Sequence, residues 1–220
     1  PRLDDKILTS WNGLMLKGYV DAYKAFQEPE YLEAALKNAH FIKSKQWQSS
    51  GALFHNYKDG KSTINGYLED YATVIDAFIG VYEITLDSQW IDIANELTSY
   101  TYAHFFDSEK QLFYFTSDQD PTLITRSFEY RDNVIPASNS MMAKNLSVLS
   151  HHFDNQTYAT TATQMLKNVL PEIEKYPSGF SNWLDLLANF QNNFYEIVVV
   201  GEDAQQKVSA INQYYLPNKL

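Results

Sequence analysis

The sequence contains no cysteine and is poor in glycine and proline. Without cysteine, these 220 residues can form no disulfide, no catalytic thiolate and no Cys-ligated zinc site. The 8 glycines and 7 prolines are too few for a collagen-like or disordered chain. Hydrophobic residues make up 45% of the sequence, which is enough for one domain with a sizeable core.

Positive charge and long hydrophobic runs are also scarce. The chain has 17 Lys and Arg against 27 Asp and Glu, a net charge of −10. An acidic surface repels phosphate backbones, so we expect no nucleic-acid partner. The longest apolar run covers residues 197–201, far short of the roughly 18 residues that cross a bilayer. We therefore expect no membrane association and a cytoplasmic location.

Helical periodicity dominates what is present. Apolar residues recur at helical spacing in seven segments, which we predict to be helices: residues 10–26, 29–46, 68–86, 88–106, 138–152, 156–170 and 180–191. The segments 10–26 and 68–86 are apolar almost all round and should be buried on both sides. The segments 29–46 and 88–106 carry a single apolar stripe and should lie outside.

This alternation predicts an all-α fold, an α/α toroid in which inner helices are ringed by outer ones. Short aromatic runs at residues 53–57 and 112–115 follow two outer helices and predict small β-hairpins, the first turning at Asp59-Gly60. A straight solenoid is the alternative architecture. Residues 194–200 are predicted to form a lone buried strand.

Polar and aromatic residues gather where the predicted inner helices begin. In a toroid these helix N-termini converge on one face, where free backbone N–H groups favour acceptors. Aromatic faces stack on sugar rings and amides bind hydroxyls, so the composition suits a carbohydrate cleft. The predicted substrate-binding residues are Trp11, Asn12, Tyr71, Ser138 and Asn139. The alternative is that the serines and asparagines only cap their helices.

Two adjacent carboxylates, Glu69 and Asp70, begin the segment 68–86 and are the leading catalytic candidates. Glycoside hydrolysis needs two carboxylates on opposite sides of the scissile bond. Neighbouring residues on a helix point about 100° apart, so one of the two would need a distant partner. The candidate partners lie in loops: Asp4, Asp5, Glu129 and Asp132, with Asp5 and Asp132 among those predicted to be catalytic. Capping of the helix start is the alternative role for the adjacent pair.

Histidine chemistry has one candidate. Sugar epimerisation needs a base that takes and returns a proton, usually histidine. None of the five histidines falls at an inner-helix start. His55, in the first hairpin, is the only candidate, and for it we favour a structural role over a catalytic one. No histidine pair has metal-ligand spacing on one helix face, so we predict no metal and no cofactor.

Four segments carry a resemblance to a known family. They read DDKILTSWNGLM at residues 4–15, GYLEDYA at 66–72, IPASNS at 135–140 after Asp132, and IVVVG at 197–201. In order and approximate spacing they resemble the YyaL/spermatogenesis-associated protein 20 family over nearly the whole chain.

The resemblance implies an N-terminal thioredoxin-like domain followed by an α/α toroid similar to N-acylglucosamine 2-epimerases and six-hairpin glycosidases. Residues 1–220 would then be a single domain, a fragment that covers the later hairpins of the toroid and lacks the thioredoxin-like domain. The implied function is a carbohydrate-active or carbohydrate-binding domain with a small sugar as its partner. The alternative is a non-catalytic scaffold that supports the thioredoxin-like domain.

The two functions make different predictions for the site. An enzyme should hold a carboxylate of raised pKa in a pocket, whereas a scaffold should have Glu69 and Asp70 fully paired or capping backbone. The chain departs from the epimerase pattern, because no histidine occupies an inner-helix start. An incomplete toroid would also leave an apolar face exposed, which favours a homo-oligomer.

Overall fold

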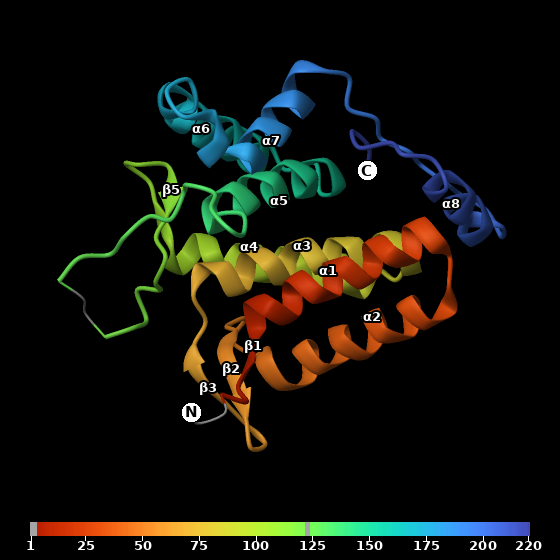
Figure 1. The fold of residues 1–220 in the computed structure, drawn as a ribbon, viewed down its shortest axis with the longest axis horizontal. Coiled ribbons are helices and arrows are strands. Elements are labelled where there is room, and N and C mark those ends of the chain that lie inside the picture. Colours follow the sequence, from red (N-terminus) through yellow and green to blue (C-terminus); the bar gives the residue numbers. More distant parts are fainter. Residues whose placement is uncertain (1–3, 122–123) are drawn as a thin grey trace.

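The computed structural model describes residues 4–121 and 124–220. Figure 1 shows a predominantly helical chain in which all seven predicted helices form. They are α1 (Thr9–Phe26), α2 (Pro29–Phe41), α3 (Leu68–Thr85), α4 (Ser88–His104), α5 (Ser138–His152), α6 (Gln156–Ile173) and α7 (Ser181–Gln191). A π-helical turn (Ile42–Gln46) extends α2, a short 3-10 turn (Pro177–Gly179) precedes α7, and α8 (Ala204–Asn212) was not predicted.

The helices pack as successive hairpins. Helix α1 packs with α2, α3 with α4, and α5 with α6. The first helix of each hairpin also packs on the first helix of the next, which gives an inner row α1, α3, α5 and α7. Each outer helix, α2, α4 or α6, packs on the inner helix of its own hairpin. The predicted alternation of inner and outer helices, and with it the toroid class, is therefore confirmed.

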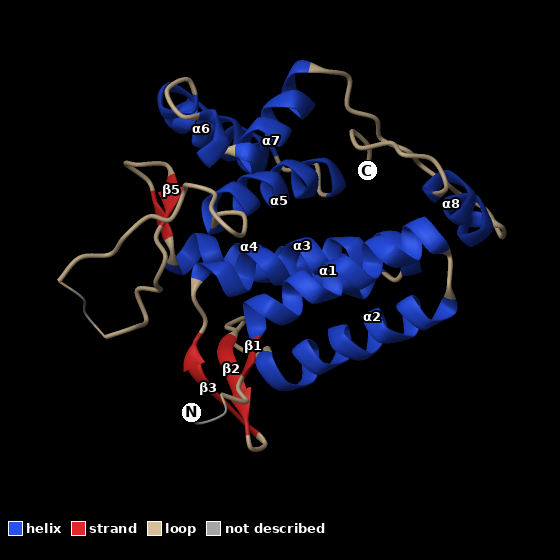
Figure 2. Cartoon of the chain, in the orientation of Figure 1, coloured by secondary structure: helices blue, strands red, loops and turns tan. Residues whose placement is uncertain are grey.

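Two small antiparallel sheets lie in the loops (Figure 2). The first has the order β1 (Ile7–Leu8), β2 (Phe54–Lys58) and β3 (Lys61–Asn65). Its turn is Asp59-Gly60, where both residues have positive φ, as a two-residue hairpin turn requires. The second pairs β4 (Phe106–Asp107) with β5 (Leu112–Phe113). Both predicted hairpins are confirmed, and the first places β2 beside the start of α1.

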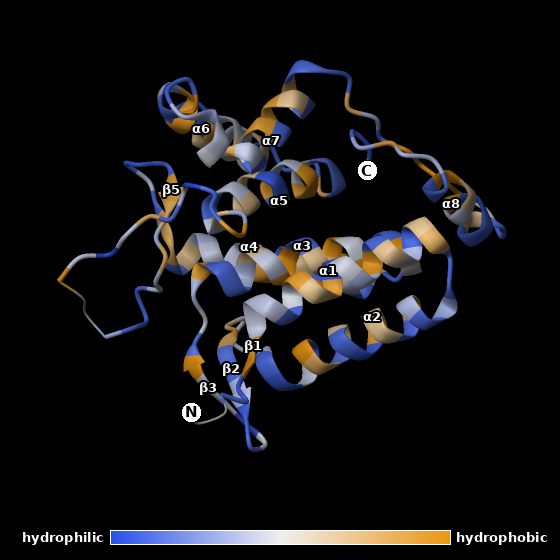
Figure 3. Ribbon diagram, in the orientation of Figure 1, coloured by the Kyte–Doolittle hydropathy of each residue, from blue (hydrophilic) through white to orange (hydrophobic). Residues whose placement is uncertain are grey.

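Helix α3 lies at the centre of the core and is buried on almost every side, as predicted. Figure 3 shows apolar colouring along α3 and mixed colouring on the outer helix α2. The same prediction is wrong for α1. Its Trp11, Met15 and Phe26 side chains are 67%, 51% and 66% exposed. Helix α3 has an inner helix on each side, whereas α1 packs against an inner helix on only one.

One further expectation needs correction within the described residues. Residues 194–200 form no strand: a single bridge joins Tyr195 to Lys219, and Val198 and Val200 are 83% and 81% exposed. One more backbone hydrogen bond, from Ile197 N–H to Leu220 C=O, continues this pairing, but it does not extend along the segment as a strand requires. None of the described helices is long and apolar enough to cross a membrane.

Candidate functional site

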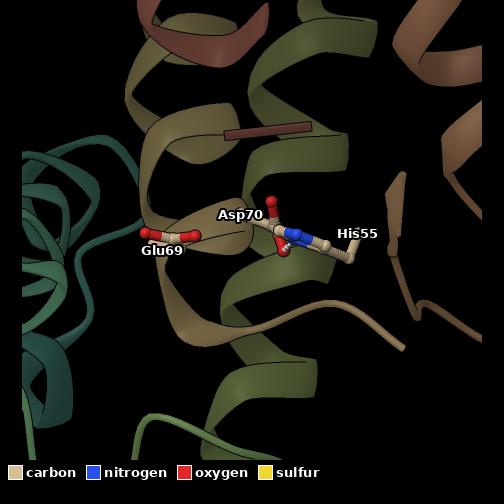
Figure 4. Close-up of side chains that lie close together, drawn as sticks. All are labelled: His55, Glu69 and Asp70. Carbon is tan, nitrogen blue, oxygen red and sulfur yellow. Dashed lines mark hydrogen bonds and ion pairs between the residues drawn. The ribbon is translucent and has the colours of Figure 1, made fainter. Parts of the chain in front are cut away.

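Asp70 connects three elements at the start of α3. It is completely buried. Its Oδ1 accepts a hydrogen bond from the Ser10 N–H of α1 at 2.8 Å, and its Oδ2 accepts one from Tyr67 N–H at 2.9 Å. The same Oδ2 lies 2.8 Å from Nδ1 of His55, on β2 (Figure 4). Asp70 therefore caps its own helix and also holds the start of α1 and the β-hairpin in place.

His55 reaches the start of the inner helix α3 from the hairpin, although no histidine lies at an inner-helix start in the sequence. Its Nδ1 is paired with the Asp70 carboxylate, so Nε2 is the ring nitrogen that this pair does not use. The ring packs against Tyr67 with centroids 4.7 Å apart, and the side chain is 15% exposed. The hydrogen bond to the Asp70 carboxylate raises the pKa of His55, although partial burial opposes the shift. An imidazole held in this way can bind or transfer a proton.

Glu69 has an environment different from that of Asp70. Figure 4 shows the two carboxylates projecting to different sides of the α3 start, as the helical angle predicts. Glu69 is half-buried. Burial raises its pKa, and the negative charges of Asp70 and Glu129 raise it further. Burial raises the pKa of Asp70 as well, so the raised pKa alone does not distinguish the two carboxylates. The enzyme hypothesis also requires a pocket around Glu69, whereas the hydrogen bonds to both oxygens of Asp70 match the scaffold hypothesis.

The loop before α5 supplies two more carboxylates with structural contacts. Oδ1 of Asp132 accepts hydrogen bonds from Ala137 N–H and the Ser140 hydroxyl, and its Oδ2 accepts one from Asn182 N–H. Asp132 thus holds the starts of α5 and α7 together, which favours a structural role over the predicted catalytic one. Oε2 of Glu129 accepts from Ser138 N–H at 3.0 Å. Glu129 is also among the main causes of the raised pKa of Glu69.

The N-terminal carboxylates lie outside this cluster. Asp5 is exposed and forms an ion pair with Lys58 of β2. Asp4 is also exposed and pairs with Lys6 at 3.3 Å. Neither is among the main causes of the raised pKa of Glu69. The structure therefore gives no support to Asp5 as the catalytic partner, and its contacts favour a surface ion pair.

Three predicted substrate-binding residues are buried and structural. Tyr71, Ser138 and Asn139 have 0%, 1% and 0% of their surface exposed. The Tyr71 hydroxyl accepts from Leu53 N–H, and the Asn139 amide bonds both the N–H and the C=O of Phe113. Because no substrate can reach these atoms, the polar helix starts are explained by internal hydrogen bonds.

The other two predicted substrate-binding residues lie at the start of α1. Asn12 is half-buried, and its Nδ2 donates to Leu8 C=O at 2.8 Å. The Trp11 ring is 67% exposed and remains accessible to a ligand. Next to them, the Ser10 hydroxyl is buried and has no hydrogen-bond partner.

Within the described residues, one group of side chains has enough potential metal ligands close together to hold a metal ion. Donor atoms of His55, Glu69 and Asp70 lie within 4.8 Å of one another. Both oxygens of Asp70, however, already accept hydrogen bonds from backbone N–H groups, and Oδ2 also lies against His55. The arrangement fits a hydrogen-bonded carboxylate–imidazole pair better than a metal site.

The alternation of inner and outer helices defines an α/α toroid fold. No protein-family model matches the chain. Among curated proteins it is 27% identical to human spermatogenesis-associated protein 20 over 100% of the chain, and 27% identical to an uncharacterized protein of Caenorhabditis elegans over 99%. The resemblance predicted from the four motifs is confirmed. The chain spans about 30% of the length of these two relatives.

Solved structures show the same fold at low sequence identity. The glycoside hydrolase family 76 α-mannanase of Bacteroides thetaiotaomicron superposes with a TM-score of 0.67 at 18% identity, over 96% of this chain and 57% of the mannanase. The cellobiose 2-epimerase of Bacillus thermoamylovorans superposes with a TM-score of 0.63 at 13% identity, over 76% of this chain and 45% of the epimerase. An inactive α-1,6-mannanase variant of Salegentibacter superposes with a TM-score of 0.60 at 13% identity, over 74% of this chain and 47% of the variant. In that variant two consecutive aspartates are changed to asparagine, and α-1,6-mannotriose is bound.

Proposed function

We propose that this domain processes a carbohydrate at the starts of α1 and α3, with Glu69 as the general acid. The observation that supports this most directly is the environment of Glu69, a half-buried carboxylate whose pKa is raised by burial and by two neighbouring negative charges. Such a carboxyl group keeps its proton to higher pH than an exposed one and can deliver it to a leaving group. The exposed Trp11 ring, at the start of the neighbouring inner helix, offers a face on which a sugar could stack.

The reaction that these groups suit best is hydrolysis of a glycosidic bond. Glu69 would give its proton to the glycosidic oxygen as the bond to the anomeric carbon breaks. A water molecule would add to that carbon while Glu129, the second carboxylate, accepts the water's proton. His55 and Asp70 would act as a pair, in which Asp70 orients the imidazole and His55 contacts a sugar hydroxyl through Nε2.

The structural neighbours support the choice of first substrates. One neighbour is an α-1,6-mannanase whose variant with two consecutive aspartates replaced is inactive, and this chain has consecutive carboxylates, Glu69 and Asp70, at an inner-helix start. α-1,6-Linked manno-oligosaccharides are therefore the first substrates to test, followed by neutral and N-acetylated mono- and disaccharides.

Epimerisation is the second candidate, because His55 reaches an inner-helix start and its Nε2 is not used in the pair with Asp70. An epimerase would use His55 to remove and return a proton. Chromatography of the same incubations separates the two reactions, since hydrolysis shortens the oligosaccharide and epimerisation preserves its length.

The test compares the wild type with Glu69→Gln, His55→Gln and the control Glu96→Gln, which changes an exposed residue of α4. A hydrolase should lose at least about 100-fold in kcat with Glu69→Gln and little with Glu96→Gln. Loss with His55→Gln and retention with Glu69→Gln would support the epimerase instead. No turnover of any sugar by the wild type would favour the non-catalytic scaffold, for which the engaged contacts of Asp70 and Asp132 already argue.

A further inference from the structure

A cavity lies at the end of α3 opposite the candidate site, between the ends of α3 and α5 and the C-terminal segment 197–220. Helix α8 of this segment packs against α3 and α1, away from the two small sheets (Figure 1). Gln205 Nε2 donates a hydrogen bond to Ile84 C=O at 2.9 Å and ties α8 to the end of α3. Glu69 lies roughly 21 Å along the helix axis from Glu83, which lines the cavity. The cavity is therefore separate from the candidate site.

Most of the cavity wall is apolar. Its aliphatic and aromatic lining comes from α3, the C-terminal segment and α8, through the half-buried residues Tyr82, Ile197, Val199, Val208 and Ile211. The volume is about 240 Å³, slightly below the roughly 300–1,000 Å³ of pockets that hold drug-sized ligands. The wall therefore suits the apolar body of a small molecule, and the volume is too small for a folded segment of another chain.

His152, at the end of α5, brings a polar atom without a partner to this wall. Its Nε2 is buried and has no hydrogen-bond partner. The ring meets Tyr82 edge to face, with centroids 5.5 Å apart, and this contact orients it. Burial lowers the pKa of His152, so the imidazole is uncharged at neutral pH and carries one N–H. A buried polar atom of this kind costs free energy until a ligand supplies its partner.

Lys219 brings an uncompensated positive charge to the same wall. Its side chain is half-buried, and burial lowers its pKa while the negative charge of Glu83 opposes that shift. Glu83 is already ion-paired with Lys24. Among residues 4–121 and 124–220, Lys219 has no ion-pair partner of its own. A half-buried ammonium group without a counter-charge favours an anionic ligand.

We propose that this cavity binds a small aliphatic carboxylate. The carboxylate would accept hydrogen bonds from Lys219 Nζ and His152 Nε2, and the alkyl chain would lie against Val208 and Ile211. A neutral or cationic ligand of the same shape would leave the Lys219 charge uncompensated. The cavity uses no residue of the proposed carbohydrate chemistry, so the two proposals are tested independently.

The first experiment titrates hexanoate into the 220-residue chain and follows the methyl groups by NMR. The neutral and cationic probes of the same length are 1-hexanol and hexylamine. We expect saturable binding of hexanoate and binding at least about tenfold weaker for the other two, because each lacks the negative charge. Nuclear Overhauser contacts from hexanoate to the methyl groups of Val208 and Ile211 should place the ligand in the cavity without any substitution.

The second experiment removes the two polar groups one at a time. Lys219→Met keeps an unbranched apolar side chain and should weaken hexanoate at least about tenfold, while 1-hexanol changes by less than about twofold. His152→Phe keeps an aromatic ring without Nε2 and should weaken hexanoate about threefold or more. The control is Lys167→Met, at an exposed position of α6, which should change hexanoate binding by less than about twofold. If Lys219→Met lowers the melting temperature, the three probes and the contacts in the wild type decide the question.

Four results would overturn the proposal. One is no saturable binding of hexanoate below about 50 mM. Another is binding of 1-hexanol or hexylamine as tight as that of hexanoate. The third is contacts from bound hexanoate to methyl groups outside the cavity. The last is an equal effect of Lys219→Met and Lys167→Met on hexanoate binding in variants that keep the wild-type melting temperature.

Discussion

Nδ1 of His55 lies 2.8 Å from Oδ2 of Asp70, although the two residues belong to a β-hairpin and to an inner helix. The carboxylate also receives the N–H groups of Ser10 and Tyr67. One buried side chain thus fixes the imidazole and two helix starts, so its removal should affect both stability and the geometry of the candidate site.

Asp70→Asn should destabilise the fold. The asparagine side chain has one oxygen and one NH₂ group, so the NH₂ group would face either Ser10 N–H or Tyr67 N–H. At least one buried donor would then lose its acceptor. We expect a loss of about 2–5 kcal/mol in the free energy of unfolding, measured by urea denaturation. The matched control is Asp92→Asn, at an exposed position of α4. Equal stability of the two variants would contradict the capping role of Asp70.

Glu69→Gln should leave stability at pH 7 unchanged or raise it by up to about 0.5 kcal/mol. The pKa of Glu69 is raised in the folded state, so the unfolded chain ionises first as pH rises and this group costs stability above its unfolded pKa. The neutral glutamine removes that cost. The difference between variant and wild type should therefore be smaller at pH 4 than at pH 7. A large destabilisation at pH 7 would instead make Glu69 a structural residue.

The contribution of His55 to stability should decrease as pH rises. Its pKa is raised in the folded state, first by the hydrogen bond to Asp70. Folding therefore favours the protonated form, and the added stability is fully present below the unfolded pKa of about 6.5 and is lost as pH rises through the folded value. Urea denaturation of wild type and His55→Gln between pH 5.5 and 8.5 measures this change.

His152 provides a contrast of opposite sign in the same pH series. Burial lowers the pKa of His152, so its contribution to stability should be lost as pH falls through the unfolded pKa. The His152→Gln difference should therefore change with pH in the direction opposite to that of His55→Gln. Parallel changes for the two variants would contradict the assigned pKa directions.

Two glycines of α1 should respond oppositely to alanine. Gly13→Ala would force a Cβ atom to within 2.9 Å of the Thr73 backbone, so we expect a loss of about 1–3 kcal/mol in unfolding free energy. Gly18→Ala adds a methyl group in open space and should stabilise the helix by about 0.5–1 kcal/mol. Chemical denaturation of both variants gives the comparison. Similar effects at the two positions would mean that α1 does not pack on α3 through Gly13.

The helical layout could be predicted from local pattern. The apolar spacing of α3 specifies a helix buried on several sides, and Pro29 marks the start of α2 because its fixed φ and missing N–H suit the first turn. Pattern was insufficient where burial depends on neighbours. Among the described residues, helix α1 is apolar on several sides like α3 but has only one inner neighbour, and residues 194–200 pair with the chain end only around Tyr195.

The site divides in the same way. Sequence alone determined the residue types at the inner-helix starts, the adjacent carboxylates Glu69 and Asp70, the acidic charge and the family resemblance, because these depend on composition, order and spacing. Only the tertiary structure decided that Asp70 is buried and hydrogen-bonded while Glu69 is half-buried, and that His55 of the hairpin lies beside Asp70. Burial and pKa depend on which distant groups surround an atom, and local periodicity carries no information about those groups.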